Sequence, residues 1–420
     1  MKKFIFFVRA YNDLDHFSPL IWKCIQKGDQ PTILITTKLK IENDYRFKLI
    51  NKNQNIRVIY DIDETFEKHF KAKSFIEKVI RRIYFLRRDQ NSLIGKLYRK
   101  FFFDLSAQLD FMRRENFHSC IFEWSTPYAR GDKIEKYFFA AKALGITTFA
   151  LPHGCNIFVN SDVTYGYRES FNKGKLVDQS STRLFDYYIF QNPLRRDGWV
   201  KWGFEPSKTQ AWGSLRFSPE WAKMNLNACP EFNMDMKKTK LNIVFMQFQK
   251  EYNIDNEAVF DFLKDVSNIE DISLVVKDAT REGKSFYDQK SASNELGASL
   301  VSWVGNDVHS PSLIEWSDIV IVIGGSIGIE AMLQNKPVLY PSFLSSNFTL
   351  YEKFKAAYCT NSKEESIKLI NEFKNNRPHE ELPGVEKMIQ EIVYAGQDKF
   401  DVLEKYYNEI SADYLNYLKP

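Results

Sequence analysis

The chain has few cysteines and few histidines, and neither residue type occurs at metal-ligand spacing. Its five cysteines are dispersed without a CxxC pair, and its six histidines are equally scattered. A structural zinc ion needs four Cys or His ligands, usually in closely spaced pairs, so we expect no metal and no other cofactor. A small, odd number of cysteines is typical of a reducing compartment, which predicts a cytoplasmic protein.

The sequence also lacks a long hydrophobic run, an internal repeat and a low-complexity tract. A membrane-spanning helix needs about 18 consecutive apolar residues. The N-terminal run KFIFFV (3–8) is far shorter and is followed by Arg9, so it does not fit the apolar region of a signal peptide. We interpret it as a first buried strand.

Charge is nearly balanced overall but is concentrated in one segment. The net charge is +4, with 44% apolar and 27% charged residues, which is ordinary for a folded globular protein. Residues 68–103 contain eleven Lys or Arg and two acids, a local net charge of +9. Apolar residues recur there near helical spacing, which is typical of an amphipathic helix pair with a solvated face. The alternative is peripheral attachment to an anionic membrane, at the inner face of the cytoplasmic membrane. Nucleic-acid binding is not expected, because no recognised module accompanies the charge.

Apolar runs alternate with helical periods in both halves of the chain. A length of 420 residues predicts two large domains. The alternation predicts the α/β class, with two Rossmann-like doubly wound domains of parallel strands facing a cleft. The expected strands are residues 3–8, 31–37, 56–61, 119–124, 146–152, 185–191, 241–248, 272–278, 299–304, 318–324 and 337–341. We assign the first domain to residues 1–217, a linker to 218–240, the second domain to 241–395, and a C-terminal helix that packs back on the first domain to 396–420.

The sharpest motif is DIVIVIGGSIGIEAMLQNKPVLYP, residues 318–341. A buried strand ends at Gly324, Gly325 and Ser326, and a helix begins there. The two glycines permit close backbone approach, Ser326 can cap the helix, and the N–H groups of a helix start bind phosphate. Glu330 follows on the first turns of this helix, within reach of a ribose beside that phosphate. The alternative is a plain strand–turn–helix junction with no ligand.

This block resembles the donor half of GT-B glycosyltransferases of bacterial surface-carbohydrate and capsular polysaccharide biosynthesis, and is similar to the capsule-type Kdo transferases. LPHGCN (151–156) resembles a Pro-His-Gly loop, and AWGSLRFSPEW (211–221) resembles a Gly-Ser-x-Arg-Phe segment that crosses between domains. VVKDATRE (275–282) stands where relatives often carry a Lys-Pro-His-Pro or Lys-x-x-x-Arg loop; the Pro-His-Pro sequence is absent here. The resemblance implies that Ser214 and Arg216 contact the donor, with Arg216 a candidate for binding an acidic sugar.

Polar residues that follow strands are candidates for catalysis or phosphate binding. Glu123 could serve as a general acid/base or as the nucleophile of a retaining enzyme; the alternative is a partner for Arg130. His153, in the Pro-His-Gly loop, could position the donor or act as acid or base; the alternative is a structural histidine. Lys277 and Arg281 could offset the charge of a leaving phosphate; the alternative is a pair of solvated loop charges.

Two DxD patterns, Asp13 to Asp15 and Asp61 to Asp63, match the metal-binding motif of the other major glycosyltransferase fold. Two complete α/β halves argue against that fold. We therefore interpret both patterns as turn or helix-start acids.

These observations together predict a metal-independent, nucleotide-sugar-dependent glycosyltransferase. The resemblance implies a CMP-linked acidic sugar, such as Kdo or a nonulosonate, as the donor, and a lipid-linked glycan as the acceptor. Three alternatives remain: a nucleotide-sugar 2-epimerase, a teichoic-acid-type polyol-phosphate transferase, and a non-catalytic glycan-binding protein.

Overall fold

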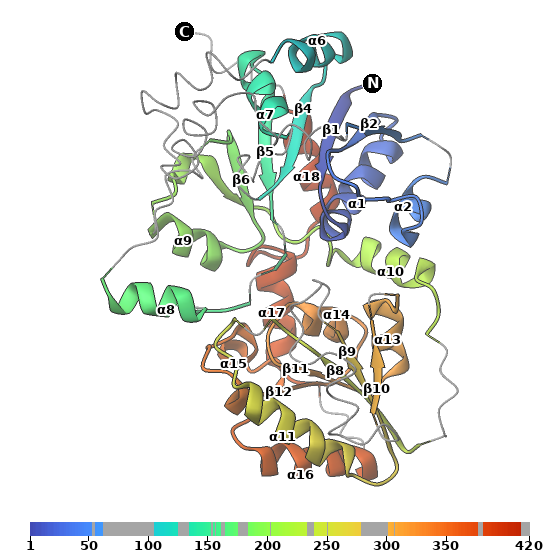
Figure 1. Ribbon diagram of the computed structural model, residues 1–420, viewed down its shortest axis with the longest axis vertical. Helices are drawn as coiled ribbons and strands as arrows, with labels where there is room; N and C mark the ends of the chain where they lie inside the picture. Colours follow the sequence, from blue (N-terminus) through green and yellow to red (C-terminus); the bar gives the residue numbers. More distant parts are fainter. Residues whose placement is uncertain are drawn as a thin grey trace, which may run out of the picture. The chain divides into compact units, whose positions relative to one another are not determined.

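The chain forms two compact units, each built from more than one segment of the sequence. The computed structural model describes residues 1–52, 55–61, 105–124, 134–152, 154–155, 157–160, 164–174, 184–201, 203–232, 239–249, 251–278, 301–305, 307–376 and 381–412. The first unit comprises Met1–Gly154, Asp178–Arg216 and Asp401–Pro420. The second comprises Cys155–Val177 and Phe217–Phe400. Figure 1 shows each unit as a sheet flanked by helices.

The first unit holds a seven-stranded parallel sheet in the order β3-β2-β1-β4-β5-β6-β7. Its strands are β1 (Lys3–Val8), β2 (Gln30–Ile35), β3 (Arg57–Tyr60), β4 (Ser119–Glu123), β5 (Thr147–Leu151), β6 (Tyr187–Phe190) and β7 (Thr209–Ala211). Its helices are α1 (Tyr11–Gln26), α2 (Tyr45–Ile50), α6 (Ser106–Glu115), α7 (Ile134–Ala143), α9 (Pro193–Lys201), the 3-10 helix η2 (Pro206–Lys208) and α18 (Val402–Ser411). Each strand expected in this half is present; β7 is additional.

Both faces of this sheet are covered, which explains the continuous apolar run in β1. Phe7 stacks on Phe122 of β4, with ring centroids 4.3 Å apart, on the face that α6 and α7 cover. On the opposite face Phe6 packs against Phe17 of α1, and Phe4 contacts Tyr407 of α18. Parallel strands buried on both faces are apolar at every position rather than at alternate ones.

Helix α18, near the C-terminus, belongs to the first unit. The fully buried Tyr406 donates a hydrogen bond of 2.9 Å to the carbonyl oxygen of Gly213. Lys23 of α1 forms ion pairs with Asp401 at 3.2 Å and with Glu404 at 3.0 Å. The helix is therefore attached to the sheet end and to α1 by both apolar and charged contacts.

The second unit holds a six-stranded parallel sheet in the order β10-β9-β8-β11-β12-β13. Its strands are β8 (Leu241–Met246), β9 (Ile272–Lys277), β10 (Val301–Val304), β11 (Ile319–Val322), β12 (Val338–Pro341) and β13 (Tyr358–Thr360). Its helices are α8 (Tyr165–Asn172), α10 (Pro219–Ala228), α11 (Asn256–Ser267), α13 (Ser310–Trp316), α14 (Ile327–Leu333), η3 (Ser342–Leu344), α15 (Leu350–Phe354), α16 (Lys363–Asn376) and α17 (Gly384–Val393). Each strand expected in this half is present; β13 is additional.

Two segments lie elsewhere than the sequence patterns place them. Residues 155–177, assigned to the first domain by sequence, fall in the second unit. Within the expected linker 218–240, Pro219–Ala228 forms helix α10, which buries Trp221 and packs on α13 and α14. Pro219 occupies the first turn, where its missing N–H costs no hydrogen bond. The proline therefore starts a helix at a position where we expected a linker.

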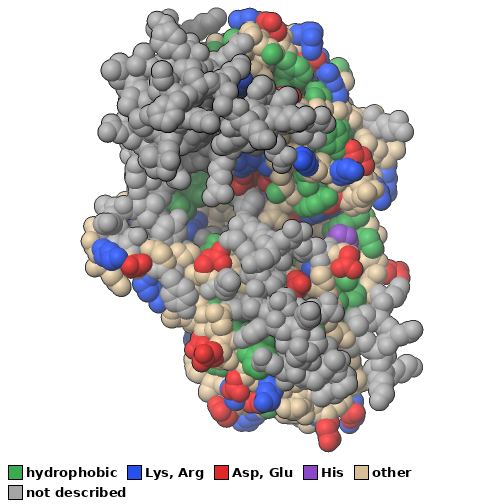
Figure 2. Space-filling view, in the orientation of Figure 1, with side chains coloured by type: hydrophobic (Ala, Val, Ile, Leu, Met, Phe, Trp, Pro, Cys, Tyr) green, Lys and Arg blue, Asp and Glu red, His purple; other side chains and the backbone are tan. Residues whose placement is uncertain are grey.

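No helix that the structure describes has both the length and the apolar character needed to cross a bilayer. Figure 2 shows acidic and basic side chains interspersed on the visible surface of both units. The basic segment 68–103 lies outside the described residues, so its proposed membrane contact stays a prediction.

Candidate functional site

Strand order reverses once in each sheet, and those two places are the natural ligand positions. In doubly wound sheets, ligands bind beyond the carboxyl ends of the strands at such a switch point. The switch lies between β1 and β4 in the first unit and between β8 and β11 in the second. The residues just beyond these strands define the candidate site of each unit.

At the first switch point a buried ion pair joins the two strands. Glu123 is the last residue of β4 and is 9% exposed, and its carboxylate pairs with the guanidinium of Arg9, which follows β1. The backbone N–H of Arg9 donates to the carboxylate of Asp13 at 2.7 Å, which fixes the start of α1. Glu123 is thus a buried, ion-paired carboxylate at the switch point, and its acid/base role stays a prediction. Its ion-pair partner in the structure is Arg9; Arg130 lies outside the described residues.

Arg9 is a site residue that the sequence patterns did not single out. In the sequence it only interrupts an apolar run, and its relation to Glu123 depends on β1 pairing with β4. A basic residue directly after the first buried strand is the signal that could have identified it.

At the second switch point the two glycines are closely packed against one aromatic ring, that of Phe248. A Cβ at Gly324 would lie 2.8 Å from the ring of Phe248, and one at Gly325 would lie 3.0 Å from the same ring. Gly325 also has φ +91°, in the region that only glycine adopts easily. Close contact with Phe248 is enough to explain why both positions are glycine. The predicted approach of a phosphate would be a second explanation.

Helix α14 starts at this turn and carries the predicted ribose contact. Ser326 is its N-cap residue, but its hydroxyl makes no capping hydrogen bond, contrary to the expectation. Glu330 lies in the first turn of the helix and is 8% exposed. Tyr351, on α15, donates a hydrogen bond of 2.8 Å to the carbonyl oxygen of Gly325. The ring of Phe248 and the hydroxyl of Tyr351 therefore both restrain the Gly324–Gly325 turn.

Lys277, the last residue of β9, points into the protein rather than outward. It is 4% exposed, and its Nζ donates a hydrogen bond of 2.6 Å to the carbonyl oxygen of Gly305, just beyond β10. Burial lowers the pKa of the Lys277 amine to about 8, against the opposing effect of the nearby Asp278 and Asp307 carboxylates. The predicted loop cation is thus a buried amine. Arg281 lies outside the described residues.

The predicted donor contacts Ser214 and Arg216 belong to the first unit, not to the second. Ser214 is fully buried, and Arg216 lies 3.6 Å from the carboxylate of Asp15, which also pairs with Arg46. Burial by itself would raise the pKa of Asp15, but the charges of Arg46 and Arg216 outweigh it and lower the pKa to about 2. Arg216 therefore takes part in a partly buried charge network of the first unit.

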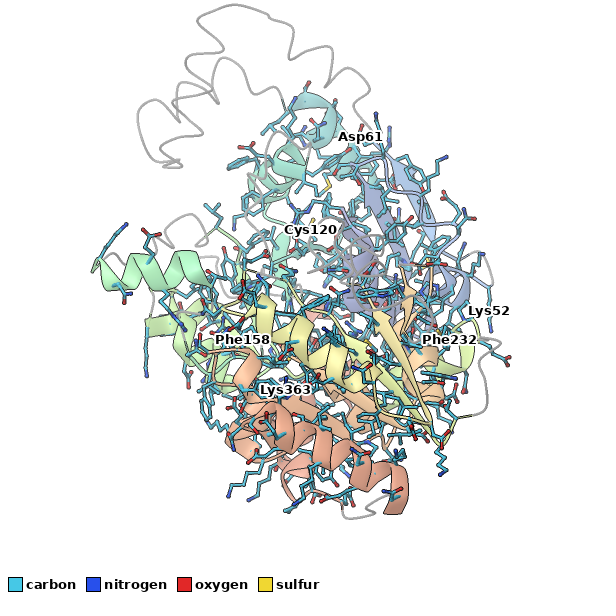
Figure 3. The ribbon with its side chains drawn as sticks, turned by 60° about the horizontal axis from the view of Figure 1, so that its bottom comes forward. Lys52, Asp61, Cys120, Phe158, Phe232 and Lys363 are labelled. Atoms are coloured by element: carbon cyan, nitrogen blue, oxygen red, sulfur yellow. The ribbon has the colours of Figure 1, made fainter. Side chains whose placement is uncertain are left out.

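Of the remaining sequence candidates, Asp13 and Asp61 have structural roles, and Asp63 and His153 lie outside the residues that the structure describes. Asp13, in the first turn of α1, accepts hydrogen bonds from the backbone amides of Arg9 and Ala10 just before the helix, as expected of a helix-start acid. Asp61 accepts a hydrogen bond of 2.7 Å from Tyr137 (Asp61 is labelled in Figure 3). Within the described ranges, no group of three or more His, Cys, Asp or Glu side chains is placed to hold a metal ion.

Comparisons with known proteins show the fold but no sequence family. No protein-family model matches the chain, and no curated protein matches its sequence. Among solved structures, the S. aureus MnaA–UDP co-structure has 15% identity and a TM-score of 0.59, covering 100% of this chain and 99% of the other. The Neisseria meningitidis UDP-GlcNAc 2-epimerase bound to UDP-GlcNAc has 12% identity and a TM-score of 0.52, covering 94% and 95%. A Rickettsia africae glycosyltransferase has 12% identity and a TM-score of 0.54, covering 98% and 99%.

These structures match this chain along nearly its whole length, through both sheets. The expected fold class is therefore confirmed, while the expected CMP-linked acidic donor stays a prediction. The chain is an α/β protein of the GT-B type, with two Rossmann-like units, and its fold is that of bacterial UDP-GlcNAc 2-epimerases and glycosyltransferases.

Proposed function

We propose that this protein binds a nucleotide-activated sugar and changes the configuration of the sugar at C2. The observation that carries the proposal is the end-to-end likeness to structures of UDP-GlcNAc 2-epimerases and to a structure holding UDP. Sequence patterns placed glycosyl transfer first and 2-epimerisation among the alternatives; the structural neighbours favour the alternative. A UDP-linked sugar is accordingly the first substrate to test.

The first unit supplies the acid/base chemistry in this proposal. Inverting C2 breaks its C–H bond: the proton passes to a base, and the electron pair forms a C1=C2 double bond as the C1–O bond to the nucleotide diphosphate breaks. Re-addition of the diphosphate at C1, with a proton delivered to the opposite face of C2, completes the inversion. A carboxylate is a suitable base, and such groups typically contribute about 10²–10⁴-fold to rate. Glu123 is a buried carboxylate at the first switch point, and its ion pair with Arg9 holds it in one orientation.

The second unit binds the nucleotide in this proposal. Ser326 and the backbone N–H groups around Gly325 contact the phosphates, and the Glu330 carboxylate accepts hydrogen bonds from the ribose hydroxyls. Lys277 donates a hydrogen bond to the carbonyl oxygen of Gly305, just beyond β10. In this proposal its positive charge also stabilises the phosphates electrostatically. No metal is assigned to the site.

A second candidate function, glycosyl transfer, is favoured by the likeness to the Rickettsia africae glycosyltransferase over nearly the full length of both chains. In that case Glu123 would deprotonate an acceptor hydroxyl or attack the sugar. The donor would be a UDP-linked sugar or the CMP-linked acidic sugar that the sequence resemblance implies. The acceptor would be a lipid-linked glycan, reached through membrane contact of residues 68–103.

Incubation in D₂O separates the two functions. The protein is mixed with UDP-GlcNAc, UDP-glucose or CMP-Kdo, without acceptor, and the sugars are followed by NMR. An epimerase changes the sugar configuration and incorporates deuterium at C2. A transferase leaves the C2 hydrogen of the UDP-linked sugars in place and at most hydrolyses its donor slowly. If no sugar changes and no nucleotide binds, both proposed functions are wrong.

A further inference from the structure

Two adjacent glycines form the most flexible backbone that a protein can place at a ligand position. Without a Cβ, each glycine samples conformations closed to other residues, and fixing it on folding or binding costs more entropy than for any other residue. The turn of Gly324 and Gly325 at the second switch point is therefore suited to bind a ligand tightly only if something else holds it.

Phe248, two residues beyond β8, holds this turn on one side. One edge of its ring faces Gly324 and the opposite edge faces Gly325, so the ring spans both residues. The contact is close enough that a methyl group on Gly324 would meet the ring at 2.8 Å. The turn cannot move toward β8 without displacing the ring.

The ring of Phe248 is itself held by two aromatic neighbours. Tyr252 lies 4.9 Å away in a tilted arrangement, and Phe158 lies 5.9 Å away in an edge-to-face arrangement, measured between ring centroids. Phe158 and Tyr252 in turn stack on each other at 5.6 Å. The three rings form a closed cluster, in which each ring contacts the other two, and Phe158 (labelled in Figure 3) is 3% exposed.

Phe158 is fixed by backbone as well as by ring contacts. It forms a β-bridge with Thr349, and the amides of Val159 and Leu350 complete hydrogen bonds of 2.8 Å between the two segments. Asn347, 3% exposed, accepts hydrogen bonds from the side-chain amides of Asn160 and Asn253. Residues 157–160 are thereby attached to the second unit, although they belong to a segment flanked on both sides by residues of the first.

We infer that Phe248 is a positioning residue for the ligand of the second unit: its ring, held by Phe158 and Tyr252, fixes the Gly324–Gly325 backbone before the nucleotide binds. Tyr351 completes the restraint through its hydrogen bond to the carbonyl oxygen of Gly325. The inference rests on the proposed function, because the ligand concerned is the nucleotide.

The test compares Phe248→Ala, Phe248→Leu and Phe248→Tyr in the full-length protein. UDP affinity is measured by calorimetry well below the unfolding midpoint of each variant. Phe248→Ala should weaken UDP binding roughly tenfold, because the two glycines then lose their order in the free protein. Phe248→Leu should lie between, and Phe248→Tyr, which keeps the ring, should bind UDP within about threefold of the wild type. Phe262→Leu is the matched control, a fully buried phenylalanine of the same unit on α11.

The control separates positioning from general stability. Phe262→Leu should lower the unfolding midpoint and leave UDP affinity unchanged. The inference is overturned if Phe248→Ala, or Phe248→Leu should the alanine variant not fold, binds UDP like the wild type. It is also overturned if Phe262→Leu weakens binding as much as the Phe248 variants. A wild-type protein that binds no nucleotide would instead contradict the proposed function, and this inference with it.

Discussion

Arg9 and Glu123 form an ion pair across the carboxyl ends of β1 and β4, the two strands between which the first sheet reverses its order. Glu123 is the proposed acid/base group of the first unit, whereas the proposed nucleotide contacts, Gly325, Ser326 and Glu330, belong to the second unit. Catalysis and nucleotide binding should therefore respond to different substitutions.

Replacing Glu123 by Gln should lower turnover of the sugar substrate by about 10²–10⁴-fold while UDP affinity stays nearly unchanged. The amide keeps the shape of the side chain but cannot accept a proton. Steady-state kinetics and a UDP titration measure the two effects separately. Glu115→Gln is the control, because Glu115 also pairs with an arginine, Arg57 at 2.8 Å, at the end of α6. Full activity of Glu123→Gln would assign catalysis to another residue.

Replacing Glu330 by Gln should weaken UDP binding by about 1.5–3 kcal/mol, the usual range for a hydrogen bond to a charged group. Glu315→Gln, at an exposed position on the neighbouring helix α13, should have no effect. The comparison with 2′-deoxy-UDP sharpens the test. If Glu330 binds the ribose, the deoxy compound should lose affinity for the wild type and lose less for Glu330→Gln. Equal losses for both proteins would contradict the ribose contact.

The buried amine of Lys277 should make stability depend on pH in the alkaline range. Its folded-state pKa of about 8 is lower than the 10.5 of the exposed amine, so the unfolded chain binds more protons between these values. Stability should therefore rise from pH 8 to pH 10.5, by at most about 3 kcal/mol relative to Lys277→Met. Urea unfolding of both proteins at several pH values measures the difference. Parallel pH curves for the two proteins would show that burial does not lower the pKa of the Lys277 amine.

Replacing Gly324 by Ala should destabilise the second unit by about 1–3 kcal/mol, because the new methyl group meets the Phe248 ring at 2.8 Å. The double variant with Phe248→Leu should recover part of this loss, since leucine leaves more room. Gly198→Ala is the control: no atom lies within 4 Å of the added Cβ in helix α9. Thermal unfolding is measured for the wild type, the Gly324→Ala and Phe248→Leu single variants, the double variant and Gly198→Ala. Strict additivity in the double variant would exclude a steric cause.

Much of the fold follows from local patterns, and the exceptions have local causes too. Buried parallel strands are continuous apolar runs, which is why the long ones are predictable. β7 and β13 are three residues each, TQA and YCT, and too short and mixed to stand out. Helix α1 begins at Tyr11, only three residues after β1, because Asp13 binds the amides of Arg9 and Ala10.

The site was less predictable because its residues take their meaning from pairing between distant strands. Glu123 could be proposed from its position at a strand end, but its partner Arg9 emerges only when β1 lies beside β4. Two adjacent glycines, Gly324 and Gly325, indicate that something approaches the backbone closely, but the sequence does not show whether it is a phosphate or a side chain. In the structure the ring of Phe248 makes this approach. Lys277 looked like a loop cation because its bond to Gly305 depends on β9 pairing with β10.

The discontinuous make-up of the two units has a consequence for biosynthesis. Translation proceeds from the N-terminus, and the second unit is complete once Phe400 has been made. The first unit, begun earliest, still lacks α18 at that moment, so Tyr406 has not yet reached Gly213 and Lys23 has no acidic partner from the last helix. The half that is synthesised first is thus finished last, and a ribosome-bound or prematurely terminated chain exposes the apolar surface of α1 and β1 that α18 normally covers.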